Sequence, residues 1–117
     1  MGSEYVPERG DVVWLHFDPQ AGHEQAGTRP ALVVSPASYN RRVGLALFCP
    51  VTSQVKGYPF EVILPPGLQV QGAVLADQIK NLDWRSRRAK YAGKVPRASL
   101  AEVVGKILAL VEPRAAR

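Results

Sequence analysis

The chain has 117 residues, of which 46% are apolar and 21% are charged. This is the balance of an ordinary globular protein and argues against a disordered chain. We expect a single domain over residues 1–117, because this length supports one hydrophobic core but not two. Cys49 is the only cysteine and lies in an apolar stretch, which excludes a disulfide framework within the chain. No apolar run approaches the ~20 residues that a membrane span requires.

The two ends of the sequence carry no predicted structure. Residues 1–4 are expected to be flexible or tag-derived, and residues 113–117 are expected to form a flexible tail. The start lacks the basic and then apolar layout of a secretory signal. Together with the exclusion of disulfides, this predicts a cytoplasmic location.

The net charge is +5, from 15 Lys and Arg against 10 Asp and Glu. Six of these cations fall within thirteen residues that contain no acid: Arg85, Arg87, Arg88, Lys90, Lys94 and Arg97. Such a patch attracts polyanions or an acidic protein partner, and arginine suits forked phosphate contacts. A solvated basic face without a target is an equally open interpretation.

Most segments have the pattern of short strands punctuated by glycine and proline. The predicted strands are Asp11–Asp18, Ala31–Pro36, Val43–Thr52, Phe60–Leu64 and Gly72–Lys80. The first has apolar residues on both faces, which predicts cover from both sides. In the third, Pro50 predicts that the far end is a sheet edge or a bulge. The expected connections are a loop over Pro19–Thr28, a hairpin over Ser53–Pro59, and a turn with a short basic strand within Leu82–Lys94.

The last segment has a helical period. Apolar residues recur at steps of three and four: Leu100, Val103, Val104, Ile107, Leu108 and Val111. Ser99 and Glu102 have the spacing of a capping box, and Pro113 is placed to end the helix.

These elements predict a mainly β protein, a small antiparallel barrel whose C-terminal helix covers an open side. Because the first strand is apolar on both faces, a second subunit is expected to cover one of them in a two-fold homodimer. The helix is the alternative cover.

Several kinds of site are excluded or disfavoured. The chain has no G-x-x-x-x-G-K-[ST] phosphate loop and no G-x-G-x-x-G motif. His16 and His23 are the only histidines, too sparse with Cys49 for a zinc site. As an acid–base pair they are disfavoured, because His16 lies within a strand, where packing or a local hydrogen bond is expected, and His23 lies in a loop.

Glu24 and Arg29 are better candidates, although most loop residues of these types are simply solvated. Arg29 precedes Pro30, which restricts its backbone, and Gly22 and Gly27 on either side of Glu24 allow a close approach to a ligand. An acid and an arginine suit the cleavage of RNA by its own 2′-hydroxyl. The carboxylate would accept the hydroxyl proton, and the guanidinium would stabilise the charge on the pentacoordinate phosphate, without a metal ion.

Five stretches, in order between about Tyr5 and Lys80, resemble the MazF/PemK (Kid) family of toxin–antitoxin ribonucleases. They are "GDVVWLHFDP", "EQAGTRPALVVSP", "YN", "PVTSQVKGYPFEV" and "VLADQIK". The combination of E-Q-A-G-T-R-P with P-x-T-x-x-x-K-G-Y-P-F-E is specific. Departures lie mainly in Arg85–Arg97, which leaves the antitoxin and the RNA preference open.

The resemblance implies a homodimeric SH3-like barrel of the MazF/PemK/CcdB type. It implies a toxin that needs no cofactor and cleaves single-stranded RNA, usually messenger RNA, at a short site, for which an ACA-containing sequence is a candidate. The expected ends are a 2′,3′-cyclic phosphate and a 5′-hydroxyl, and the expected outcome is arrested growth. The expected partner is a MazE-like antitoxin with an acidic segment.

The family's catalytic glutamate, arginine and threonine correspond to Glu24, Arg29 and Thr52. Thr52 would bind the scissile phosphate; an ordinary hydroxyl at a strand end is the alternative. The base and acid roles of Glu24 and Arg29 stay open, because a guanidinium is a poor proton donor. Candidate RNA-binding residues are Phe17, Asn40, Ser53, Gln54, Lys56, Tyr58, Asp77, Gln78 and Lys80. Core packing is the alternative for Phe17, and a turn-forming role is the alternative for Asn40.

Two other functions remain open from the sequence. A toxin of the same fold can act by binding DNA gyrase, because fold alone does not fix function. A non-catalytic module can bind nucleic acid through the basic patch. The set of Glu24, Arg29 and Thr52 favours the ribonuclease, because neither alternative requires these residues.

Overall fold

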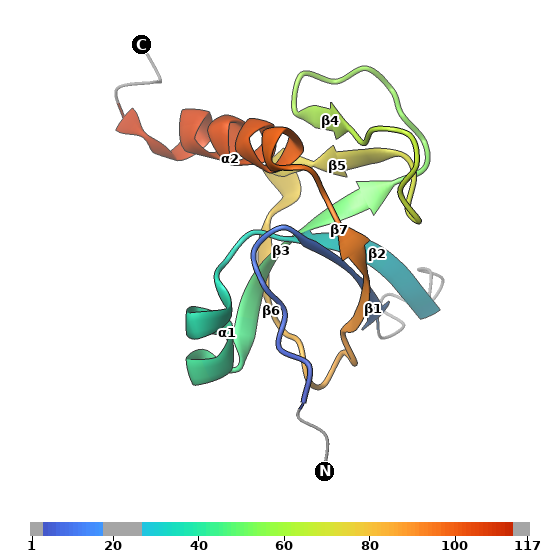
Figure 1. The fold of residues 1–117 in the computed structure, drawn as a ribbon. Helices are drawn as coiled ribbons and strands as arrows, with labels where there is room; N and C mark the ends of the chain where they lie inside the picture. Colours follow the sequence, from blue (N-terminus) through green and yellow to red (C-terminus); the bar gives the residue numbers. More distant parts are fainter. Residues whose placement is uncertain (1–3, 18–26, 114–117) are drawn as a thin grey trace.

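The computed structural model describes residues 4–17 and 27–113 (Figure 1). Its strands are β1 (Asp11–Phe17), β2 (Gly27–Val33), β3 (Leu45–Thr52), β4 (Glu61–Ile63), β5 (Ala73–Leu75), β6 (Lys80–Asp83) and β7 (Lys90–Lys94). The helices are α1 (Ala37–Val43) and α2 (Arg97–Val111), and a 3₁₀ turn, η1, spans Ala76–Gln78. The prediction of a mainly β protein with a C-terminal helix is confirmed.

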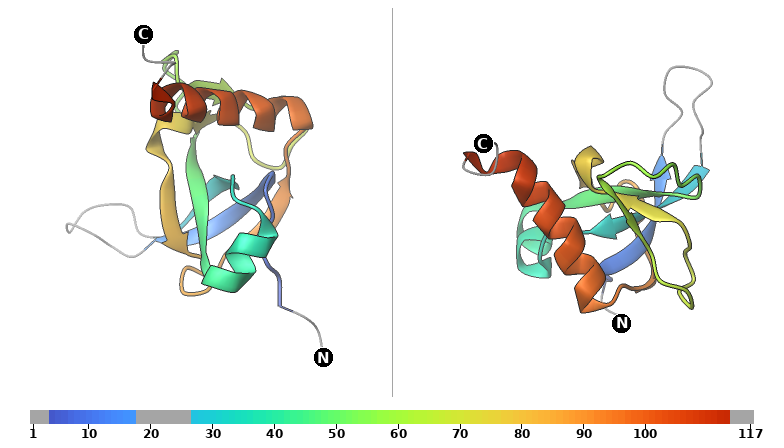
Figure 2. Two further views of the ribbon diagram at one scale, coloured as in Figure 1. Left: turned by 90° about the vertical axis from the view of Figure 1, so that its left-hand side faces the viewer. Right: turned by 90° about the horizontal axis from the view of Figure 1, so that it is seen from above.

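All pairs of strands in the described sheet are antiparallel, in the order β4-β5-β3-β2-β1-β7. β6 also pairs with β3, along the same edge as β5 but farther from the end of the strand. The sheet curls into an open barrel, and α2 lies across one end beside β4 and η1 (Figure 2). The C-terminal helix therefore covers an open side, as predicted.

The two faces of β1 pack into two separate hydrophobic clusters. Val12 belongs to the cluster that includes Leu32. Val13 and Leu15 belong to the other, which is built around Phe48 and Trp84. Burial of each such large side chain contributes about 1.5–3 kcal/mol to folding. The prediction that β1 is covered from both sides is confirmed, and the described chain itself provides that cover.

β2 begins at Gly27, not after Pro30, so Arg29 lies on a strand and not on the predicted loop. Pro30 is opposite Trp14 of β1, whereas the pairing of β2 with β3 starts only at Ala31. Proline thus occupies a position with one neighbouring strand, the kind of edge position that tolerates a missing N–H.

The connection from β3 to β4 is not the predicted hairpin, because β5 lies between these strands in the sheet. Pro50 itself pairs with Ala31 of β2, but beyond it β3 pairs with β5 alone among the described residues, so the predicted sheet edge is found at Val51 and Thr52. On its other edge, β3 pairs with β6 up to Phe48 and with β5 from Val51. Pro50 lies between these two pairings, where a missing N–H costs no hydrogen bond of the sheet.

Two further segments differ from the prediction. Gly72–Lys80 is not one strand, because η1 separates β5 from β6; the buried Ala76 follows β5 in the apolar run and so hides this turn in the sequence. The helix α1 was not predicted, since its seven residues are too few to show an apolar period. Its last residue, Val43, was assigned to a strand, but Gly44 ends the helix with a left-handed φ of 81° before β3 begins.

α2 packs Leu100, Val103 and Ile107 against the cluster that contains Val12. The predicted capping box is wrong: the helix begins at Arg97, its N-cap is Pro96, and no side chain caps it. The Ser99 N–H instead donates to the carbonyl of Pro96. No helix in the described part of the chain is long and apolar enough to cross a membrane.

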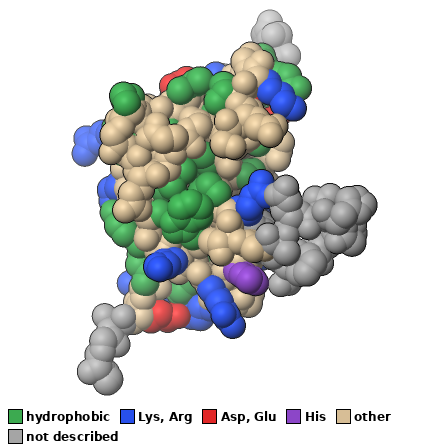
Figure 3. Space-filling model, turned by 90° about the vertical axis from the view of Figure 1, so that its right-hand side faces the viewer, with side chains coloured by type: hydrophobic (Ala, Val, Ile, Leu, Met, Phe, Trp, Pro, Cys, Tyr) green, Lys and Arg blue, Asp and Glu red, His purple; other side chains and the backbone are tan. Residues whose placement is uncertain are grey.

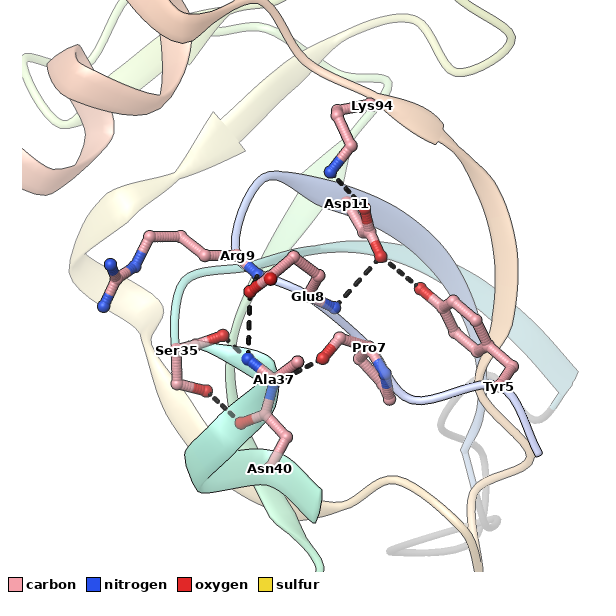
Figure 4. Close-up of polar contacts among 9 residues, drawn as sticks. All are labelled: Tyr5, Pro7, Glu8, Arg9, Asp11, Ser35, Ala37, Asn40 and Lys94. Atoms are coloured by element: carbon pink, nitrogen blue, oxygen red, sulfur yellow. Dashed lines mark hydrogen bonds and ion pairs between the residues drawn. The ribbon is translucent and has the colours of Figure 1, made fainter. Parts of the chain in front are cut away.

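Asn40 fastens α1 to the rest of the molecule (Figure 4). Its Nδ2 donates to the carbonyl oxygens of Pro7, at 2.8 Å, and Ser35, at 3.0 Å, and its Oδ1 accepts from the Ser35 hydroxyl at 2.6 Å. Trp84 Nε1 donates to the Asn40 carbonyl at 2.9 Å. Asn40 is 0% exposed, so the prediction that it contacts RNA is wrong.

Replacing Asn40 with alanine should lower the free energy of unfolding by about 2–4 kcal/mol, because it leaves buried polar groups of Pro7 and Ser35 without partners. Urea unfolding followed by circular dichroism measures this. Ser38→Ala, at an exposed position of the same helix, is the matched control and should change stability by less than about 0.5 kcal/mol. An Asn40→Ala protein as stable as the control would contradict the assigned role.

Candidate active site

The first part of the candidate site lies at the edge of the sheet where β1 ends and β2 begins. Phe17 and Gly27 are paired there, and Arg29 is opposite Leu15. Glu24 and His23 lie outside the described residues, and of Phe17 only the backbone is described. The roles predicted for Glu24 and for the Phe17 side chain therefore remain predictions.

Arg29 is exposed, at the end of β2 that adjoins residues 18–26. The last pair between β2 and β3 is Ala31 with Pro50; Arg29 lies two residues before Ala31 and Thr52 lies two residues after Pro50, so both lie at the same end of the two strands. Two of the three predicted catalytic residues, which are far apart in the sequence, thus lie at the same end of neighbouring strands.

Thr52 is the last residue of β3 and is partly buried. Its Oγ1 accepts a hydrogen bond from the backbone N–H of Gln54 at 3.0 Å. This is the local contact expected of an ordinary hydroxyl at a strand end. The hydroxyl keeps its own proton, so it can still donate one hydrogen bond to a phosphate oxygen.

Gly72 fixes the backbone of Thr52 from the other side. A Cβ atom at Gly72 would lie 2.1 Å from the Thr52 carbonyl oxygen, and φ of Gly72 is +121°. Thr52 also pairs with Ala73, the first residue of β5. Only a glycine allows the two backbones to approach this closely.

Gly72→Ala should therefore displace Thr52 and lower both stability and any activity that needs its hydroxyl. We expect a loss of at least about 2 kcal/mol in unfolding free energy, from the clash and the left-handed φ. Thermal unfolding measures the effect. Gly67→Ala is the matched control for strain alone, because Gly67 has a φ of +94° but an open surrounding. Equal melting temperatures for the two variants would contradict this account of Gly72.

Beyond Thr52, the chain crosses to β4 through a loop that carries four predicted RNA-binding residues. Ser53, Gln54, Lys56 and Tyr58 are all exposed. Sequence reasoning missed the residue that holds this loop: Glu61, which is only 9% exposed and accepts hydrogen bonds from the backbone of Lys56 and Gly57. A carboxylate in a strand pattern is normally expected to face solvent, so no pattern in the sequence indicates this role.

Asp77, Gln78 and Lys80 are also exposed, on η1 and at the start of β6. Lys80 pairs with Phe48, four residues before Thr52 on β3. At about 3.4 Å per residue, this places Lys80 some ~14 Å from Thr52 along the strand. β3 thus carries the loop residues at its end and Lys80 beside its middle, but the predicted contacts to RNA remain predictions.

The basic segment Arg85–Arg97 is partly neutralised by acids from the N-terminal part of the chain. Arg85 stacks on Trp84 and forms two hydrogen bonds to Glu4, which lower the pKa of the Glu4 carboxyl. Lys94 pairs with Asp11 at 2.7 Å (Figure 4). The segment has no acid within its own sequence, yet these two cations are already paired.

The structure also shows the surroundings of His16 and Cys49, which the sequence disfavoured as site residues. His16 is exposed, so of its two expected roles, core packing is wrong and a local hydrogen bond remains a prediction. Burial raises the pKa of Cys49 to about 12, so its thiol is neutral and not nucleophilic at ordinary pH. No cluster of three or more His, Cys, Asp or Glu side chains suited to a metal ion occurs among the described residues.

One face of the molecule combines apolar and basic side chains. Hydrophobic side chains gather in its middle, and Lys and Arg side chains lie around them (Figure 3). Such a surface suits an unpaired nucleic acid, whose bases stack on apolar groups while its phosphates meet cations.

Comparison with known proteins decides the family. The family model described as "PemK-like, MazF-like toxin of type II toxin-antitoxin system" matches residues 8–111. The chain belongs to this toxin family. It is 49% identical to the endoribonuclease toxin MazF of Escherichia coli K12, over 95% of this chain and 99% of that protein. It is 39% identical to the E. coli endoribonuclease PemK, over 86% of this chain and 78% of that protein.

Solved structures agree. Crystal structures of MazF and of MazE–MazF from Deinococcus radiodurans are each 60% identical to the chain, with TM-scores of 0.84 and 0.88. Both cover 92% of the chain, and the chain covers 98% and 97% of them. The predicted family and the barrel-type fold with its C-terminal helix are confirmed.

Proposed function

We propose that the chain is an endoribonuclease toxin that cleaves single-stranded messenger RNA at a short sequence. The family and the relatives named as endoribonucleases support the activity. Within the structure, the proposal is supported by the position of the exposed Arg29 and of Thr52 at the same end of the paired strands β2 and β3. Arg29 lies only five residues after Glu24, the proposed base.

In this proposal the nucleophile belongs to the substrate. Glu24 accepts the proton of the 2′-hydroxyl, and the 2′ oxygen forms a bond to phosphorus while the bond from phosphorus to the 5′ oxygen breaks. Arg29 stabilises the charge on the pentacoordinate phosphate, and Thr52 donates a hydrogen bond to a phosphate oxygen. The leaving 5′ oxygen takes up a proton from solvent water, so the products are a 2′,3′-cyclic phosphate and a 5′-hydroxyl. No metal ion takes part, because the attacking hydroxyl needs only a base.

We also propose two protein partners. One is a second copy of the chain, which would cover apolar side chains that α2 leaves exposed: Leu108 at 49%, Leu110 at 54% and Val111 at 66%. The other is a MazE-like antitoxin with an acidic segment, since solved relatives include a MazE–MazF complex and this chain has a net charge of +5. Because messenger RNA is the proposed substrate, the site of action is the cytoplasm.

Purified protein incubated with a long single-stranded transcript in excess EDTA should cut it at one short recurring sequence. The new 5′ ends should carry a hydroxyl, shown by kinase labelling without prior phosphatase treatment, and the new 3′ ends a 2′,3′-cyclic phosphate, shown by resistance to phosphatase until acid opens the ring. Mapping the ends also tests whether the site contains ACA. Intact RNA in a stable complex would support a binding module instead, and inhibition of DNA gyrase with intact RNA would support a gyrase toxin.

Glu24→Ala and Arg29→Ala should each lower the cleavage rate by at least about 100-fold, as expected on removing a general base or a charge-stabilising group. Arg29→Lys should fail as well, because an ammonium lacks the planar fork that matches a phosphate. Single-turnover cleavage measures the rates. Arg42→Ala, which removes an exposed arginine of α1, is the control and should cut like the parent. Cleavage by any site variant within a few-fold of the parent would contradict the assigned roles.

A further inference from the structure

The loop from Thr52 to Glu61 has no regular secondary structure, yet the structure ties it down at three points. At its start, the Gln54 N–H donates to Thr52 Oγ1. Near its end, Lys106 Nζ of α2 donates to the carbonyl of Pro59 at 2.6 Å. Between these points, the loop backbone is bound by the carboxylate of Glu61.

The contacts of Glu61 converge on two successive residues. The Lys56 N–H lies 3.1 Å from each carboxylate oxygen, and the Gly57 N–H lies 2.8 Å from Oε1. The N–H of Glu61 itself donates to the Tyr58 carbonyl at 3.1 Å, which closes the turn. Successive backbone N–H groups that converge in this way form a concavity for an anion, and here the anion is a side chain of the same chain.

This arrangement separates a buried anchor from exposed contact groups. Glu61 is 9% exposed, whereas Val55 and Tyr58 are 43% and 60% exposed and Lys56 is exposed as well. Gly57 has a left-handed φ of +83° with open space around the position of a Cβ atom, so this glycine is needed for the turn and not for packing. Glu61 therefore fixes the backbone from which Lys56 and Tyr58 project.

We infer that Glu61 is a positioning residue for substrate: it holds the loop in the conformation in which Lys56 and Tyr58 engage the RNA next to the scissile phosphate. The inference rests on the proposed ribonuclease function and extends it. Glu61 touches no RNA itself. It acts through the loop, so its removal weakens RNA binding and sequence discrimination more than the rate of the bound complex.

The test uses the full chain and Glu61→Gln, in which an amide NH₂ replaces one acceptor oxygen and faces backbone donors. Binding is measured with an RNA that carries a 2′-deoxy nucleotide at the mapped cut site, and the rate with saturating normal RNA. The dissociation constant should rise about tenfold, the size of a lost stacking or polar contact. The saturated rate should stay within about threefold, and Glu102→Gln, the same change at an exposed position of α2, should alter neither.

A double-mutant cycle separates positioning from general destabilisation. In a Lys56→Ala/Tyr58→Ala background, Glu61→Gln should weaken binding by less than about twofold, because groups that act as one unit are not additive. A full additive loss in that background would overturn the inference, as would unchanged binding by the single variant.

A second variant covers the case in which Glu61→Gln does not fold. Gly57→Ala disturbs the same turn from the solvent side and should reproduce the tenfold loss of binding; parent-like binding by it would also overturn the inference. These results are distinct from a failure of the proposed function, in which the parent protein itself would leave RNA intact in EDTA.

Discussion

The pairing of β3 with three other strands is the constraint on which the candidate site depends. One edge of β3 is bound to β2, and the other is bound first to β6 and then to β5. The first of these pairings ends at Ala31 and Pro50, and Arg29 and Thr52 each lie two residues beyond it at the same end of the two strands. The pairing with β6 places Lys80 beside the middle of β3. The pairing with β5 places Gly72, just before β5, against Thr52, the last residue of β3. The proposed site is assembled by backbone hydrogen bonds, which makes its geometry largely independent of the exposed side chains.

Charge on this molecule is used in two ways. Some cations neutralise acids of the N-terminal segment: Arg85 binds Glu4, and Lys94 binds Asp11, which is 3% exposed and also accepts from Tyr5. Burial, aided by the hydrogen bond to Asp11, raises the pKa of Tyr5 far above its usual value, so this phenol stays a donor. The exposed cations Arg88, Lys90 and Arg97 remain on the surface that a polyanion or an acidic partner would meet.

Much of the fold follows from patterns within single segments. Alternation and apolar runs located β1, β3 and β4, and the three- and four-residue steps located α2, because these signals need no knowledge of distant neighbours. α1 could not be found in this way, since it is held by Asn40, whose partners Pro7 and Trp84 are 33 and 44 residues away along the chain. The same limit explains the error at Asn40, where the type of residue suggested a surface contact.

The residues of the candidate site also differ in whether a local sequence pattern indicates them. Arg29 and Thr52 could be proposed from the sequence because their motifs are specific, although the loop assigned to Arg29 is in fact a strand. Glu61 was missed because its carboxylate binds backbone atoms, which leave no mark in the sequence. In the structure, Glu61 is largely buried, and its carboxylate accepts a hydrogen bond from the Gly57 N–H of the turn.

The glycine at position 72 and the carboxylate at position 61 restrain the two ends of one connection independently. Cleavage of the RNA and recognition of its sequence would then depend on adjacent parts of the molecule that are held in place by different contacts. Exposed residues of the loop between Thr52 and Glu61 can then vary without displacing Thr52. Divergence within such toxins could in this way produce new target sequences from one unchanged chemical centre.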